Sequence, residues 1–148
     1  MLQRIQTLFL LGVVIIAFLI MYLPIYELIK EPTISTDLST ESADQFTVFN
    51  NAILAIINGA IGLLALVAIF LFKNRNLQIR ACNLALLIDC IFIGLLFFSA
   101  DTMSSTLRMR VHYLYGSYLP IINAVFLFLA VRFIKRDEEL IRSANRLR

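Results

Sequence analysis

The residues from Leu84 to Leu96, LALLIDCIFIGLL, contain a single charged side chain, that of Asp89. An ionised carboxylate at the centre of a membrane-spanning helix costs ~2.5–3.5 kcal/mol on translocon-based scales. Burial away from water favours the neutral form of a carboxylic acid. We therefore expect Asp89 to face the interior of a helix bundle, where it accepts a hydrogen bond or carries a proton.

Two asparagines are the expected neighbours of Asp89. Asn58 and Asn123 lie in other apolar runs, within stripes of side chains spaced alternately four and three residues apart. This period suits left-handed packing of neighbouring helices. Counting along the three runs from one side of the membrane places these residues at a similar, central depth. The sequence therefore predicts a buried polar cluster of Asp89, Asn58 and Asn123.

Three roles remain open for this cluster. The first is to hold the helices together, each hydrogen bond between membrane helices contributing ~0.6 kcal/mol. The second is a proton relay or a ligand contact made by Asp89. The third is contact with another subunit, because an unpaired acid within the membrane requires a partner.

The other chemically versatile residues do not form a catalytic or cofactor site. His112 is the only histidine and lies outside the apolar runs, which excludes a haem held by two histidines of this chain. Cys82 and Cys90 lie about 12 Å apart along one helix, and we interpret them as small hydrophobic side chains. Protease, hydrolase and nucleotide-binding motifs are absent from the sequence. We expect no enzyme activity, no cofactor, no metal and no nucleic-acid partner.

The whole chain is more apolar than a soluble protein. Of its 148 residues 60% are hydrophobic and only 16% charged, and the mean hydropathy is +0.85. Four apolar runs are long enough to cross a ~30 Å hydrocarbon core. We predict an all-α, four-helix transmembrane bundle that forms one domain over residues 1–148. Its helices are expected at about 8–28, 46–72, 81–100 and 114–134, followed by a helical cytoplasmic tail at 135–148.

The charges predict the orientation of this bundle. Ten of the thirteen Lys and Arg residues lie near the N-terminus, between the second and third runs, or from residue 132 onwards. Such residues concentrate on the cytoplasmic side of membrane proteins. All five tyrosines lie at the opposite ends of the first and fourth runs, where their amphipathic rings suit the headgroup region. Both termini are therefore expected in the cytoplasm, and the polar loop 30–46 outside it.

A basic cytoplasmic face is the expected contact surface. It combines the N-terminus, the segment 73–80 and the tail, and it either contacts lipid headgroups or a protein partner, or only establishes topology. Its candidate contact residues are Arg4, Lys73, Arg75, Arg80, Arg136, Arg142 and Arg146.

Three polar segments are more specific than membrane insertion requires. They are MLQRIQTLFLL at residues 1–11, NRNLQIR at 74–80 and KRDEELIRSANRLR at 135–148. With these segments the chain resembles an uncharacterised family of small four-span inner-membrane proteins of Bacteroidota, a domain of unknown function. The resemblance implies the topology and a bacterial inner-membrane location, but it supplies no activity and no catalytic residues.

These observations lead to two functional hypotheses. The first is a non-enzymatic accessory or assembly subunit of a larger inner-membrane complex, which acts through intramembrane helix packing and the basic cytoplasmic face. The alternative is a small oligomeric transporter or channel that uses Asp89 as a protonatable group. The expected partners are the lipid bilayer and either another membrane protein or further copies of this chain.

Overall fold

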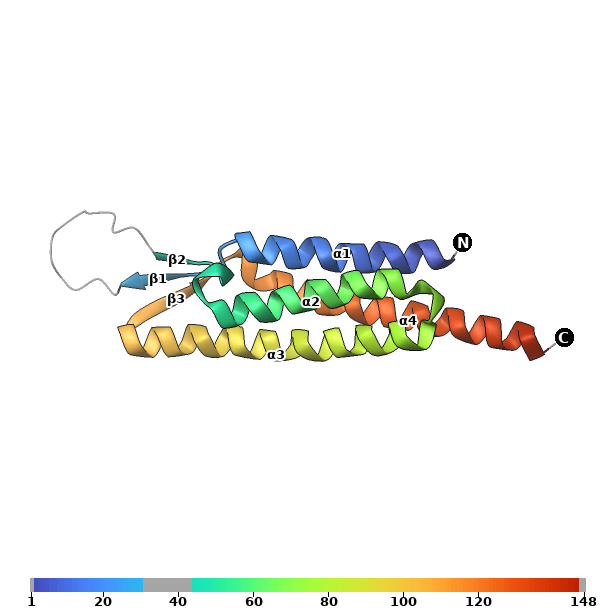
Figure 1. Ribbon diagram of the computed structural model, residues 1–148. Helices are drawn as coiled ribbons and strands as arrows, with labels where there is room; N and C mark the ends of the chain where they lie inside the picture. The colour runs from blue at the N-terminus through green and yellow to red at the C-terminus, as the bar shows by residue number, and fades with distance from the viewer. Residues whose placement is uncertain (1, 31–43, 147–148) are drawn as a thin grey trace.

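The computed structural model describes residues 2–30 and 44–146, without the side chains of 2–5, 30, 44, 73 and 141–146. Most of the predicted loop 30–46 therefore lies outside the described residues. Within the described part of the chain, four α-helices run side by side (Figure 1). They are α1 (Leu2–Tyr22), α2 (Ala52–Phe70), α3 (Arg75–Leu107) and α4 (Leu119–Arg146).

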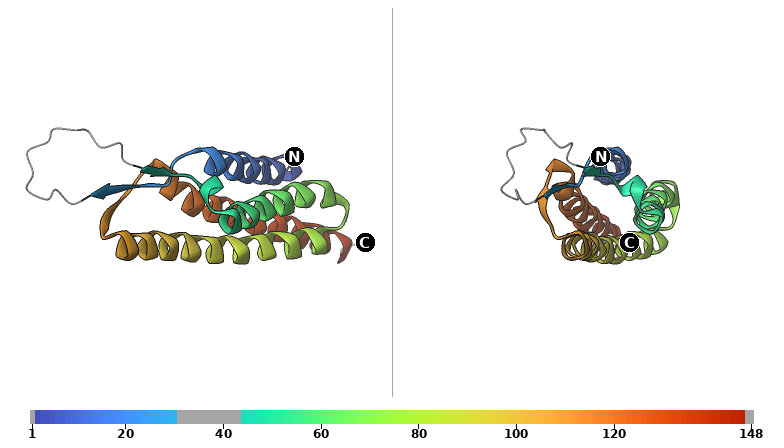
Figure 2. Two further views of the ribbon diagram at one scale, coloured as in Figure 1. Left: turned by 60° about the vertical axis from the view of Figure 1, so that its left-hand side comes forward. Right: turned by 90° about the vertical axis from the view of Figure 1, so that its left-hand side faces the viewer.

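The helices form a closed bundle in which each contacts two neighbours. Both α1 and α3 pack against α2 and α4, and the view along the bundle shows the four helices around a common centre (Figure 2). The two ends of the chain lie at the same end of the bundle (Figure 1). The predicted all-α four-helix architecture is confirmed.

The first helix ends earlier than predicted. It stops at Tyr22 instead of continuing to about residue 28, because Pro24 has no backbone N–H to donate and disfavours the helical conformation in the residue before it. The following residues form β1 (Tyr26–Lys30). Glu27, Leu28 and Lys30 are good helix formers, so the pairing of this segment with its neighbouring strands makes it a strand.

A small antiparallel sheet covers the bundle end opposite the termini, and the sequence analysis missed it. Among the described residues it has the strand order β2-β1-β3, with β2 at Asp44–Phe46 and β3 at Met109–Tyr113. Tyr26 of β1 pairs with Phe46 on one side and with Tyr113 on the other. The sheet thus joins the segments after α1, before α2 and after α3 (Figure 1).

The third helix is longer than predicted at both ends. The basic segment 73–80, expected to be a loop, begins with the last residue of a 3-10 turn (Leu71–Lys73) and, after Asn74, forms the first residues of α3. Its Arg, Gln and Leu side chains favour a helix. The polar residues 101–107 also belong to the helix. Within this part the Thr102 hydroxyl donates a hydrogen bond to the Phe98 carbonyl at 2.8 Å. The helix ends where Arg108 adopts a left-handed conformation with φ of 52°.

The fourth helix contains the predicted tail. A 3-10 turn over Tyr115–Tyr118 leads into α4, and Pro120 lies in its first turn, where its missing N–H costs nothing. The helix continues without interruption to Arg146. Its last turns extend beyond the ends of the other three helices (Figure 1).

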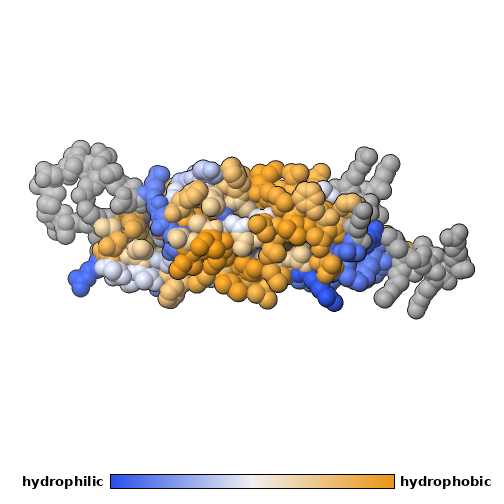
Figure 3. All heavy atoms as spheres, in the orientation of Figure 1, coloured by the Kyte–Doolittle hydropathy of each residue, from blue (hydrophilic) through white to orange (hydrophobic). Residues whose placement is uncertain are grey.

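The surface of the bundle is apolar around its middle and hydrophilic towards its ends (Figure 3). Large side chains such as Leu8, Ile56, Phe98 and Phe128 are more than half exposed. Within the described residues, three segments are long and apolar enough to cross a membrane, whereas the apolar part of α1, Gln6–Tyr22, is shorter. The three segments are Ala52–Phe70, Arg75–Leu107 and Tyr115–Leu140.

Candidate functional site

Asp89 and Asn123 meet in the centre of the bundle. Both residues have no solvent-exposed surface, one on α3 and the other on the neighbouring helix α4. The amide Nδ2 of Asn123 donates a hydrogen bond to Oδ1 of Asp89 at 3.2 Å. The structure therefore brings these two members of the predicted polar cluster together.

Asn58, the third member, makes its hydrogen bond elsewhere. It is 1% exposed, but its Nδ2 donates to the backbone carbonyl of Ala17 on α1 at 2.7 Å. A Cβ added at Gly62, one turn further along α2, would lie 3.4 Å from the Ala17 side chain, so small residues bring α1 and α2 close together here. Among the described residues no hydrogen bond joins Asn58 to Asp89 or Asn123, and the cluster is divided into two contacts.

Each of these three side chains retains one unsatisfied oxygen. Asp89 Oδ2, Asn123 Oδ1 and Asn58 Oδ1 are buried and have no hydrogen-bond partner among the described residues. A buried polar atom without a partner costs about 1–3 kcal/mol. The bundle therefore holds buried acceptor atoms that the described protein groups do not satisfy.

No cationic side chain is available to Asp89 inside the bundle. Residues 6–22, 52–70 and 119–131, which form most of the three other helices, contain no Lys, Arg or His. On α4 the nearest cation to Asn123 is Arg132, about 14 Å further along the helix axis, and its side chain is exposed. The Asp89–Asn123 contact is thus an acid–amide pair without a counter-ion.

A second buried polar contact joins α1 to the tail, and the sequence analysis did not predict it. Gln6 and Asp137 are 7% and 5% exposed, and Gln6 Nε2 donates both to Asp137 Oδ2 and to the Phe133 carbonyl. Asp137 follows Ile134 by three residues, so extending the buried stripe of α4 by one step would have identified it. This contact fixes the N-terminal part of α1 against the end of α4.

The predicted basic face is only partly described. Arg80 and Arg136 are exposed, whereas Arg75 is half-buried. The side chains of Arg4, Lys73, Arg142 and Arg146 lie outside the described residues. These positions belong to the end of the bundle that holds both termini.

An open hollow of about 500 Å³ lies beside Arg75. Residues from the start of α3 line it, and Glu138 of the tail contributes an acidic side chain. The Arg75 guanidinium has one buried nitrogen, Nη1, without a partner among the described residues. The α2–α3 connection and the tail are therefore neighbours at this end.

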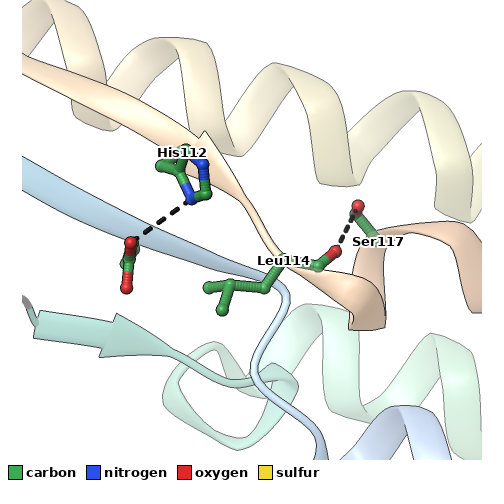
Figure 4. A network of polar contacts seen from close by, with 4 residues as sticks. His112, Leu114 and Ser117 are labelled. Carbon is green, nitrogen blue, oxygen red and sulfur yellow. Dashed lines mark hydrogen bonds and ion pairs between the residues drawn. The ribbon is translucent and has the colours of Figure 1, made fainter.

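The opposite end is held together by the sheet. His112 Nδ1 of β3 lies 3.3 Å from Glu27 Oε1 of β1, and the Ser117 hydroxyl donates to the Leu114 carbonyl at 2.7 Å (Figure 4). The ring of Tyr26 is buried and stacks on Phe46 with 4.5 Å between ring centroids. Burial raises the pKa of the Tyr26 hydroxyl above its ordinary value.

No group of three or more His, Cys, Asp or Glu side chains within the described residues is placed to hold a metal ion. The hydrogen bonds of Asn123, Asn58 and Gln6 connect helices in pairs. They join α4 to α3, α2 to α1, and α1 to α4.

The comparisons with known proteins give one finding. The family model described as "Domain of unknown function (DUF4293)" matches residues 2–147, almost the whole chain. No curated protein and no solved structure shows a significant match.

Proposed function

We propose that this chain, which belongs to the DUF4293 family of unknown function, is a non-enzymatic accessory or assembly subunit of a larger inner-membrane protein complex. In this proposal α1 crosses the membrane together with the three longer helices, and both termini are cytoplasmic. The partners in this proposal are the surrounding lipid and another membrane protein, whereas a second copy of this chain is the partner in the alternative, an oligomeric transporter or channel.

The observation that carries this proposal is that the polar groups of the bundle are buried and bind one another or the backbone of a neighbouring helix. Asp89, Asn123 and Asn58 are completely or almost completely buried and are bound between helices. Such groups stabilise a bundle but are not presented to a substrate. This distribution favours a protein that acts through its outer surfaces.

Two features of the end that holds both termini suit contact with a protein partner. The last turns of α4 project beyond the other helices (Figure 1), and Arg80 and Arg136 are exposed there. Arginine is enriched at protein–protein interfaces. The partner surface that complements this face is acidic and lies at the cytoplasmic headgroup level.

The test is affinity purification of the tagged protein at native expression level in mild detergent, followed by sizing and mass spectrometry. The parent protein is expected in a discrete larger assembly, and the double variant Arg80→Glu/Arg136→Glu is expected to lose the partner. A second variant lacking residues 141–148 tests the tail without removing Asp137. The control is Arg110→Glu, which reverses a charge at the opposite end.

Retention of the partner by the double variant would contradict a role for the basic face. Purification of the parent as a lone monomer or homo-oligomer would contradict the accessory-subunit proposal and favour the alternative, a small oligomeric transporter or channel. The unsatisfied oxygen of Asp89 is the observation in favour of that alternative. It predicts that Asp89→Asn abolishes flux in proteoliposomes while the bundle stays folded.

A further inference from the structure

Asp89 and Asn123 share one hydrogen bond, and one additional hydrogen atom would allow them to form a second. The Asn123 amide already donates to Asp89 Oδ1. On each side chain the second oxygen, Asp89 Oδ2 and Asn123 Oδ1, is buried and has no partner among the described residues. A carboxylic acid and a carboxamide that share one N–H···O bond can also form an O–H···O bond when the acid carries a proton.

From this arrangement we infer that Asp89 binds a proton at neutral pH and forms a reciprocal acid–amide pair with Asn123. The proton resides on Asp89 Oδ2 and is donated to Asn123 Oδ1, while the Asn123 N–H is donated to Asp89 Oδ1. This arrangement satisfies both orphan oxygens. A protonated carboxylic acid has one O–H donor and retains acceptor capacity, which is what the pair requires.

The surroundings of the pair support the neutral acid. Asp89 has no exposed surface, and the interior-lining parts of α1, α2 and α4 contain no Lys, Arg or His that would compensate a negative charge. A buried charge is retained in proteins only when it is paired, and otherwise the group neutralises. Asn123, the hydrogen-bond partner of Asp89, is itself uncharged.

The consequence is that two hydrogen bonds between uncharged groups join α3 to α4, and we call this pair the neutral lock. Its two hydrogen bonds require one acid and one amide, or two amides, because a carboxamide also donates and accepts along the same edge. Asp89→Asn is therefore expected to preserve the lock. Exchange of the two residues, Asp89→Asn/Asn123→Asp, is expected to preserve it with the acid on α4.

The experiment is infrared spectroscopy of the purified full chain in lipid at pH 7, comparing the parent protein with variants. The parent is expected to show the carbonyl band of a protonated carboxylic acid, shifted in deuterated water. Asp89→Asn should lose this band, and the exchange variant should regain it. Asp101→Asn, which changes an exposed aspartate of the same helix, is the matched control and should leave the band unchanged.

A further variant keeps the test decisive if Asp89→Asn does not fold. In Asn123→Leu the Asp89 carbonyl loses its N–H donor, so its acid band should move to higher frequency. The inference is overturned if Asp89→Asn removes a carboxylate band and leaves the acid band unchanged. It is equally overturned if the parent protein and Asn123→Leu show the same acid bands.

Discussion

Asn58 and Asn123 carry the same side chain and are both buried in the bundle, but they bind different acceptors. Asn123 donates to the carboxyl group of Asp89, and Asn58 donates to the backbone carbonyl of Ala17. A helix carbonyl that already accepts a bond from its own helix retains a second lone pair. Asn58 therefore links α1 to α2 independently of any ionisable group.

Replacement of Asn58 by leucine should weaken the contact between α1 and α2. The variant loses the 2.7 Å hydrogen bond to Ala17, and we expect the free energy of unfolding to fall by about 0.6 kcal/mol, and by no more than ~2 kcal/mol. Unfolding in a denaturing detergent measures this change. Ile56→Leu, at a lipid-facing position of the same helix that is 72% exposed, is the control and should have little effect.

Gln6 joins α1 to the tail through two hydrogen bonds. Gln6→Ala removes the donor to Asp137 and to the Phe133 carbonyl and leaves a buried carboxylate without its partner. We expect faster amide hydrogen exchange in α4 from about residue 133 onwards. Gln45→Ala, which shortens an exposed glutamine at the opposite end, should leave this exchange unchanged. Equal exchange in the parent and Gln6→Ala would show that helix packing alone positions the tail.

At the scale of elements, the sheet and the bundle are joined by close backbone packing. The connection between α1 and β1 meets the turn before α4 where Gly116 lies against Pro24. A Cβ at Gly116 would overlap the Pro24 carbonyl, so glycine is required for this approach. The backbone also connects them directly, because the Leu114 N–H donates to the Ile25 carbonyl at 2.8 Å.

Substitution of this glycine should separate the sheet from the bundle. In Gly116→Ala the new methyl group displaces the Pro24 backbone, and overpacking of this kind costs about 1–3 kcal/mol. Thermal unfolding in detergent is the measurement. Gly94→Ala is the matched control, since a Cβ at Gly94 meets nothing within 4 Å and alanine favours a helix. A melting temperature of Gly116→Ala equal to that of the control would contradict this packing argument.

At the scale of the whole molecule, the apolar surface and the two polar ends predict how the protein lies in a membrane. The sheet end carries Tyr113, Tyr115 and Tyr118, which are 40%, 88% and 60% exposed. Exposed tyrosines favour the headgroup region. The opposite end carries most of the Lys and Arg residues of the chain, which favour the cytoplasmic side.

Cysteine labelling tests this orientation. In a variant in which Cys82 and Cys90 are replaced by alanine, a cysteine at Arg136 should react with an impermeant reagent only after the membrane is opened. A cysteine at Tyr115 should react in intact spheroplasts. The reverse pattern would show that the basic end lies outside the cytoplasm.

The sequence by itself determined the elements that form because of the pattern of residues within one segment. Long apolar runs require burial in lipid or in a core, and they predicted the four helices within several residues. The charge of Asp89 in such a run required an interior position, and the four-and-three spacing placed Asn123 on the matching face. The helical tail also followed from local pattern, because it continues α4 in phase.

Only the tertiary structure decided which groups meet across the bundle. Depth along a helix does not determine which neighbour a side chain faces, and Asn58 therefore binds Ala17 of α1 and not Asp89. The sheet escaped detection for a related reason. Tyr26–Lys30 is apolar enough to continue a helical run, and its pairing with Met109–Tyr113 lies about 80 residues along the chain. A short strand is stabilised by its partners, and only the packing of α1 beside α4 brings those partners together.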